Sequence, residues 1–159
     1  MQNVRHARRI AILAIGLLIC VSTIAWFLAS HLLIQWTLNQ NQQRWTRSQP
    51  MHYRYTLELM CLCPPQFTKP VSIEVKNGVT TSITYVEDGT PAEPAYFDRY
   101  ATIEKLFAVL QEALGRPGAR LNVTYHSHLG YPMRAAIDYQ PNAVDDEIYF
   151  TVRDVVALP

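Results

Sequence analysis

The stretch MHYRYTLEL, residues 51–59, decides the fold of this chain. Every second residue from Met51 to Leu59 is apolar. The residues between them are polar: His52, Arg54, Thr56 and Glu58. Successive side chains of a β-strand point to opposite faces of a sheet. The alternation therefore predicts a strand with one buried face and one polar face.

Similar strand patterns continue along the chain on both sides of one helical pattern. Further strands are predicted over residues 71–75, 79–86, 121–125, 133–139 and 148–152. Before the fourth strand, Thr102 can cap a helix whose apolar stripe runs to Leu114 and which Gly115 ends. The predicted order is β-β-β-α-β-β-β. This order is typical of an α+β domain in which one helix packs on one antiparallel β-sheet.

The pair Asn77-Gly78 indicates a hairpin between the second and third strands. A two-residue turn would set Ile73 opposite Ser82 and so mix the apolar and polar faces. A loop of three residues keeps Val75 opposite Val79, and we therefore predict the longer loop.

An apolar run without Asp, Glu, Lys or Arg covers residues 10–34, and three arginines precede it. A helix of that length is about 37 Å long and exceeds the ~30 Å hydrocarbon core of a bilayer. We therefore predict an N-terminal transmembrane helix that is not cleaved as a signal peptide. Because positive charge is retained in the cytoplasm, we expect the N-terminus in the cytoplasm and residues 35–159 on the other side of the membrane.

The predicted organisation has four parts. These are a cytoplasmic N-terminus over residues 1–9, the transmembrane helix over 10–34, a juxtamembrane linker over 35–49, and an extracytoplasmic α+β domain over 50–159.

Cys61 and Cys63 lie in the part of the chain that we place in an oxidising compartment. Residues two apart in a strand have Cα atoms about 6.6 Å apart, so a bond between the two requires a bend. Pro64 and Pro65 make that bend plausible, and we prefer an intramolecular disulfide. Two reduced, inward-packed thiols are the alternative, and a redox or metal site is a further one.

The chain resembles a bacterial envelope family known only as a domain of unknown function, family 6174, over about residues 44–153. The resemblance rests on Trp45, Tyr53-Arg54-Tyr55, Cys61-Leu62-Cys63-Pro64, Val75 to Gly78, Thr102 to Phe107, Val123-Thr124-Tyr125, Gly130-Tyr131-Pro132, Asp138 and Asp145-Asp146-Glu147. It implies one small domain displayed from a bacterial membrane or secreted, and it implies no activity. With the orientation above, we expect the chain in the bacterial inner membrane, with its domain periplasmic or otherwise extracytoplasmic. His126 stands where the resemblance leads us to expect an acidic residue.

His126 and His128 are two apart on a predicted strand, so both would point to the polar face. Together with Asp138, and with Asp146 or Glu147 nearby, they are candidate metal ligands. Solvated surface histidines are the alternative that we favour. An enzyme or metal-binding protein built on these residues is the second function that we weigh.

No nucleophile elbow, phosphate-binding loop or zinc-protease helix occurs in the sequence. We therefore expect no catalytic residues and no cofactor. A net charge of +1 and the lack of a basic stripe argue against nucleic-acid binding.

We favour a binding or assembly module of the cell envelope. We expect the chain to cross the membrane once and to bind an envelope protein as its partner. An accessory subunit recruited through its transmembrane helix is a third hypothesis. The candidate contact residues are Arg54, Glu58, Tyr131, Arg134 and Asp138. For Tyr131 we favour a turn role in Gly130-Tyr131-Pro132 over a contact role.

Overall fold

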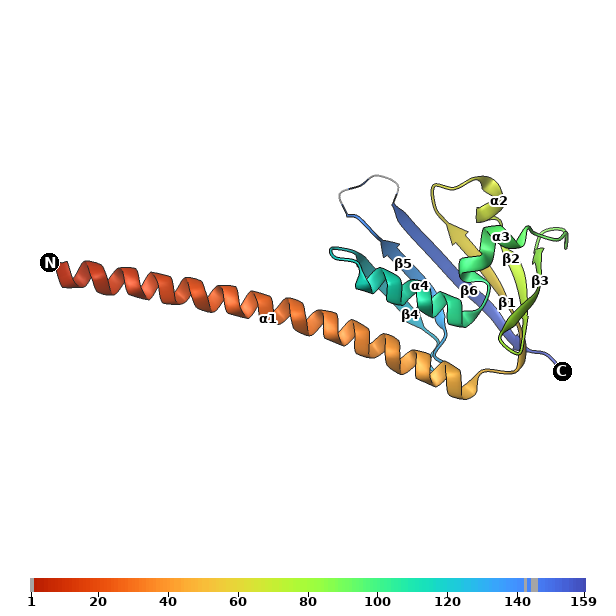
Figure 1. Cartoon of the computed structure of the whole chain (residues 1–159), viewed down its shortest axis with the longest axis horizontal. Coiled ribbons are helices and arrows are strands. Elements are labelled where there is room, and N and C mark those ends of the chain that lie inside the picture. Colours follow the sequence, from red (N-terminus) through yellow and green to blue (C-terminus); the bar gives the residue numbers. More distant parts are fainter. Residues whose placement is uncertain (1, 142, 144–145) are drawn as a thin grey trace. The chain divides into compact units, whose positions relative to one another are not determined.

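The computed structural model describes residues 2–141, 143 and 146–159, and leaves undescribed the side chains of residues 2–14, 24, 27 and 28. The chain divides into two compact units, one ending at Thr37 and one spanning Leu38–Pro159. Helix α1 (Gln2–Ser48) begins in the first unit and ends in the second. Figure 1 labels the elements in chain order.

Among the described residues, no helix has the length and apolar character that crossing a membrane requires. This finding contradicts the predicted transmembrane helix over residues 10–34. A helix that crosses a membrane needs about 20 consecutive apolar residues. Ser22 and Thr23 lie within the predicted span. Residues 10–14, 24, 27 and 28 of the predicted span lie outside the described side chains.

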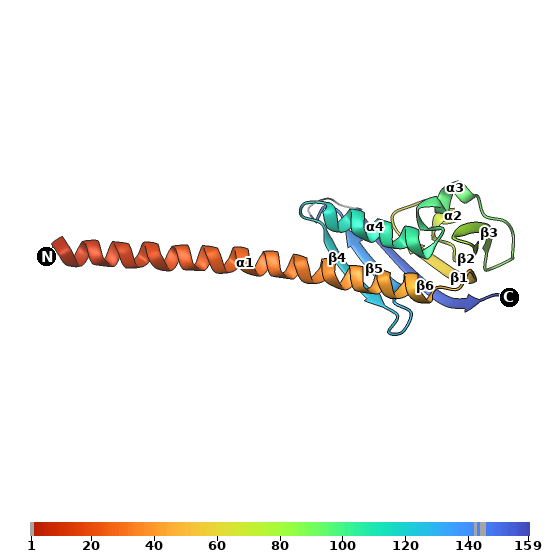
Figure 2. The ribbon, with the colours of Figure 1, turned by 60° about the horizontal axis from the view of Figure 1, so that its bottom comes forward.

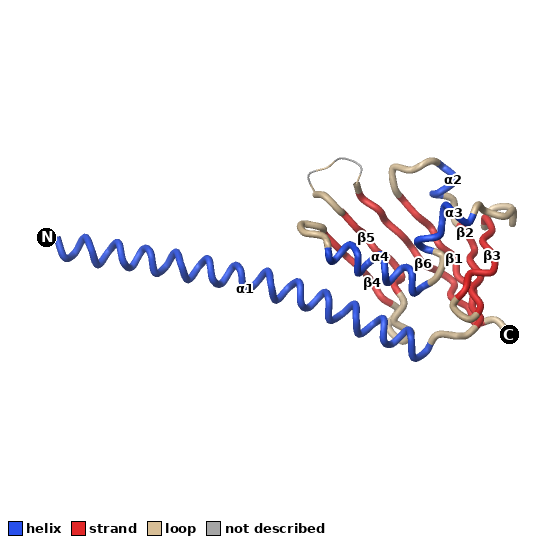
Figure 3. Tube along the Cα trace, in the orientation of Figure 1, coloured by secondary structure: helices blue, strands red, loops and turns tan. Residues whose placement is uncertain are grey.

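The second unit contains a six-stranded antiparallel sheet with the spatial order β3-β2-β1-β6-β5-β4. The strands are β1 (His52–Met60), β2 (Val71–Lys76), β3 (Val79–Tyr85), β4 (Arg120–Tyr125), β5 (Pro132–Asp138) and β6 (Glu147–Ala157). Figure 3 shows the helices and strands of this unit in separate colours. The first and last strands are neighbours at the centre of the sheet.

The predicted order with a single helix is wrong, because two short helices and a 3-10 turn interrupt the strands. These are α2 (Pro65–Thr68), α3 (Pro94–Phe97) and η1 (Asp98–Tyr100). Both short helices start with a proline, whose fixed φ suits the first helical position. Four residues are too few to produce a helical period in the sequence, so these elements read as loops.

The β2–β3 hairpin has a two-residue turn and not the predicted three-residue loop. Asn77 and Gly78 have φ values of 53° and 76°, the left-handed pair that such a turn needs. Lys76 pairs with Val79, and a bulge then shifts the register so that Ile73 faces Ile83. The bulge adds one residue to β3 and so restores apolar pairing beyond the turn.

The principal helix, α4 (Ile103–Gly115), confirms the predicted cap at Thr102. The Thr102 hydroxyl accepts a hydrogen bond from the Lys105 backbone N–H at 3.2 Å. The helix lies on one face of the sheet, as Figures 1 and 2 both show. Its apolar stripe is buried there: Ile103, Leu106, Phe107, Val109, Leu110, Ala113 and Leu114.

The last three turns of α1, residues 38–48, pack on the same face of the sheet. Leu38 and Trp45 are fully buried. The Trp45 indole N–H donates to a Glu104 carboxylate oxygen at 2.7 Å, and its ring meets the ring of Tyr53 edge-on at 5.3 Å. The predicted linker over residues 35–49 therefore overlaps the folded unit, which starts at Leu38.

The hairpin loop between β4 and β5 touches this helical segment at Gly130. Gly130 has φ of +80°, and a Cβ placed there would collide with the Asn41 carbonyl oxygen and lie 3.0 Å from the Arg44 Cβ. The Arg44 guanidinium also donates to the Ser127 carbonyl oxygen at 3.2 Å. Only glycine allows this approach of helix and loop.

We predict that Gly130→Ala lowers the free energy of unfolding of the full chain by about 3 kcal/mol, because a left-handed φ and a steric collision both oppose the methyl group. The matched control is Gly89→Ala, since Gly89 has φ of +71° and no atom within 4 Å of the added Cβ. That control should lose only about 1 kcal/mol. Urea unfolding followed by tryptophan fluorescence measures both. Equal losses would mean that residues 38–48 do not rest on this loop.

Candidate binding surface on the open face of the sheet

The face of the sheet opposite α4 is open and polar. In β1, Tyr53, Tyr55 and Leu57 point into the core, while the side chains between them point to the open face. The strand registers extend this face across the sheet. One row consists of hydroxyl side chains, because Ser72 pairs with both Thr56 and Thr84.

Four basic residues cross the open face along a diagonal. Arg134 of β5 lies opposite Thr151, and Arg153 follows two residues later on β6. Arg153 pairs with Thr56, which lies two residues from Arg54 on β1, and a bulge separates this pair from the pair Arg54–Val156. Arg54 pairs with Glu74 on β2, and Lys76 lies two residues beyond Glu74. We call these four residues the cationic diagonal: Arg134, Arg153, Arg54 and Lys76. Each member is one strand and two residues from the next, a spacing of about 7–8 Å.

All four side chains of the cationic diagonal are exposed. Arg153 donates to Glu58 at 2.9 Å. Arg54, Lys76 and Arg134 form no ion pair with any side chain that the structure describes. Three of the four positive charges are therefore available to a partner.

Glu74 lies directly opposite Arg54 and is instead held by His52. The His52 Nε2 atom lies 2.6 Å from a Glu74 carboxylate oxygen, and its Nδ1 atom lies 2.9 Å from the Pro159 oxygen. Hydrogen bonding to Glu74, and then to Pro159, raises the pKa of His52 above its ordinary value of 6.5. Protonated His52 donates from both ring nitrogens, neutralises Glu74 and so leaves Arg54 unpaired.

The predicted contact residues have different positions. Arg54 and Arg134 are exposed members of the cationic diagonal, and Glu58 is bound to Arg153. Asp138 lies on the open face between Arg120 and Glu147, at one corner of the sheet. A shallow depression of 200 Å³ involves this corner.

Tyr131 is buried and is therefore not a surface contact. Only 7% of its area is exposed. Its ring stacks on His126 with centroids 4.8 Å apart and meets Trp45 edge-on at 6.0 Å. Gly130 supplies the positive φ of the turn, as the turn interpretation of Gly130-Tyr131-Pro132 requires.

His126 and His128 lie beyond the end of β4, in the loop that leads to β5, and not on a strand as predicted. The Nδ1 atom of His126 accepts hydrogen bonds from the backbone N–H groups of His128 and Leu129, at 3.3 and 3.0 Å. These hydrogen bonds occupy the Nδ1 lone pair of His126. Among the described residues, no three His, Cys, Asp or Glu side chains group as metal ligands.

A groove of about 390 Å³ runs between β3 and the segment that leads into α4. Its charged lining residues are Asp98 and Lys105, which pair with each other at 2.6 Å. The Thr80 hydroxyl donates to the Ala101 carbonyl oxygen across its floor. The two charged side chains of the groove therefore neutralise each other.

Sequence reasoning did not select three important residues of this surface: Lys76, Arg153 and His52. The sequence does predict which face of its own strand each residue occupies, because alternate residues share a face. Their alignment depends on the register between strands, including the bulge next to Asp154, whose φ is +55°. No signal in one strand reveals that register.

The fold and this surface define a small α+β domain with one covered and one open face of an antiparallel sheet. The family model described as a family of unknown function, DUF6174, matches residues 37–157. The chain belongs to this family, as the sequence resemblance indicated. The comparisons with curated proteins and with solved structures found no match.

We predict that Glu74→Gln lowers the pKa of His52, measured by NMR titration of its ring protons in the full chain. Glu58→Gln is the control on the same face and should leave that pKa unchanged. Because folding raises the pKa of His52, the stability from its ion pair is fully present below pH 6.5. That stability is lost as the pH rises through the folded-state pKa. A His52 pKa insensitive to Glu74→Gln would contradict the pairing.

Proposed function

We propose that residues 38–159 form a binding module of the bacterial cell envelope, in which the cationic diagonal holds an extended acidic segment of a protein partner. The observation that supports this most is that three exposed cations of the cationic diagonal form no ion pair with a described side chain. Strand pairing, with one bulge between β1 and β6, sets them along one diagonal, and Arg153 lies between Arg134 and Arg54. Charge complementarity defines the occupant as acidic.

The spacing of the cations favours an extended segment. Residues two apart in a strand are about 6.6 Å apart and point to the same side. Carboxylates at alternate positions therefore approximate the 7–8 Å step of the cationic diagonal. The hydroxyl row beside the diagonal, Thr56, Ser72 and Thr84, supplies donors and acceptors for the partner's backbone.

The same surface disfavours a nucleic acid. Glu58 pairs with Arg153 and Glu74 with His52, so carboxylates interrupt the row of basic residues that a continuous phosphate backbone would need. The net charge of the chain is only +1. A protein segment can place its carboxylates at the free cations and its neutral side chains beside the two glutamates.

The proposed compartment is extracytoplasmic. Cys61 and Cys63 are disulfide-bonded in the structure, in agreement with the bridge that we prefer from the sequence. Disulfides persist in oxidising compartments such as the periplasm and are rare in the cytosol. Their presence supports a location of residues 38–159 outside the cytoplasm.

We predict that the triple variant Arg54→Gln, Lys76→Gln, Arg134→Gln weakens binding of the peptide ETETETET about tenfold at low salt. Each exposed ion pair contributes about 0.5 kcal/mol, so three together correspond to that factor. Raising the salt concentration should weaken the wild-type complex, because screening acts on exposed charges. Fluorescence anisotropy with labelled peptide and the full chain measures these affinities.

Arg120→Gln is the matched control, because Arg120 is exposed on the same face but lies off the diagonal. It should change the affinity less than twofold, and the peptide QTQTQTQT should not bind. Equal losses from Arg120→Gln and from any single diagonal variant would reject the cationic diagonal as the site. Tighter binding of single-stranded DNA than of the acidic peptide would reject a protein partner.

A further inference from the structure

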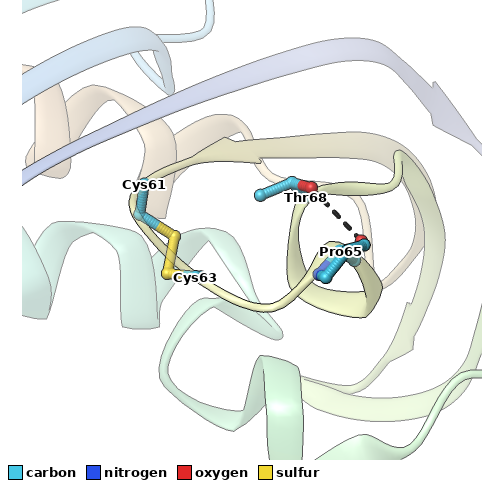
Figure 4. The surroundings of a disulfide bond; sticks show 4 residues. All are labelled: Cys61, Cys63, Pro65 and Thr68. Carbon is cyan, nitrogen blue, oxygen red and sulfur yellow. Dashed lines mark hydrogen bonds between the residues drawn. A yellow bond between two sulfur atoms is a disulfide. The ribbon is translucent and has the colours of Figure 1, made fainter.

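The bend between β1 and α2 carries a disulfide at the surface. Figure 4 shows Cys61 and Cys63 joined just beyond the end of β1, with Pro65 and Thr68 following in α2. The two Cα atoms are 5.2 Å apart, closer than the ~6.6 Å of residues two apart in a strand. The chain has therefore left strand geometry at this point. Cys63 is exposed and Cys61 is half-buried.

This bond cross-links no distant parts of the domain. A disulfide restricts the unfolded chain more as the loop that it closes becomes longer. Here the loop has one residue between the two cysteines, so the bond restricts the unfolded chain little. The strand before the bend is already held in the sheet, because Met60 pairs with Tyr149. In α2, the Thr68 hydroxyl donates to the Pro65 carbonyl oxygen at 3.2 Å. A structural role therefore accounts for little of what the bond does.

Exposed apolar side chains flank the disulfide. Leu62, between the two cysteines, is 77% exposed, and Met60 is 63% exposed. Tyr149, opposite Met60 on β6, is 44% exposed. We call these three residues the apolar shoulder. Grouped apolar exposure of this kind marks surfaces that contact other polypeptides.

We propose that the Cys61–Cys63 bond exchanges with a pair of thiols on a polypeptide that docks on the apolar shoulder. This activity does not depend on the cationic diagonal. The substrate class is a polypeptide that carries two reduced cysteines beside apolar side chains. The accessible sulfur of Cys63 is the point of attack, since exchange rates depend on access to the attacked sulfur.

The exchange has two steps. A thiolate of the partner attacks the Cys63 sulfur, which breaks the Cys61–Cys63 bond and forms a mixed disulfide, and Cys61 leaves as a thiolate that takes up a proton. The second thiolate of the partner then attacks the partner's own sulfur in that mixed disulfide and releases Cys63 as a thiolate, which is protonated in turn. The partner loses two electrons and gains a disulfide, and the Cys61–Cys63 pair gains both electrons.

The first experiment traps the intermediate. The full chain with Cys20→Ser, which removes the remaining cysteine, is purified without reductant and treated with an apolar peptide that carries a single cysteine. After acid quenching and alkylation, mass spectrometry should locate the peptide on Cys63 with Cys61 alkylated. A mixed disulfide on Cys61 instead, no adduct, or two free thiols in the untreated protein would overturn the proposal.

The second experiment tests docking with a dithiol form of the same peptide. Leu62→Ser should slow exchange with the peptide about fivefold, because an apolar contact of roughly half a leucine side chain is lost. The rate with dithiothreitol, which needs no docking surface, should stay unchanged. The control is Val79→Ser, since Val79 is 66% exposed at the opposite end of the sheet. Equal peptide rates for the two variants would reject the apolar shoulder.

Discussion

The hydrogen bond from the Trp45 indole to Glu104 joins three elements that are distant in sequence: the end of α1, the start of α4 and, through the Tyr53 ring, strand β1. The Tyr53 hydroxyl also donates to Glu104 at 3.4 Å, so two aromatic donors share one carboxylate. Burial raises the pKa of Tyr53, which keeps this donor protonated. Because the indole is fully buried, loss of its acceptor would leave an unsatisfied N–H inside the core.

This interaction holds the two helical segments on one face of the sheet, so the two faces differ. Residues 38–48 and α4 occupy one face together, and no described helix covers the other. The covered face supplies the apolar burial that stabilises the domain. The open face is consequently free to carry polar groups whose arrangement reflects strand register. The proposed contacts with an acidic partner all depend on that division.

Local patterns predicted the local features of the domain. Alternation in residues 51–59 identified β1 and its buried face, and Thr102 identified the start of α4. Features that depend on more distant contacts were missed. The bulge in β3 reconciles a two-residue turn with apolar pairing, and the helix at residues 38–48 explains why Tyr131 is buried. The membrane span predicted over residues 10–34 disagrees with the described residues, among which no helix is long and apolar enough to cross a membrane.

The position of β6 between β1 and β5 has a consequence for biosynthesis. Strands β1 to β3 form one meander and β4 to β6 another, and among the described strands the pairing of β1 with β6 joins them. A ribosome releases β1 long before β6, so the central strand pair cannot form until almost all of the domain has emerged. Contacts between such distant segments slow folding. The nascent first meander must therefore wait with one edge of β1 unpaired, a state that favours association with other chains until β6 closes it.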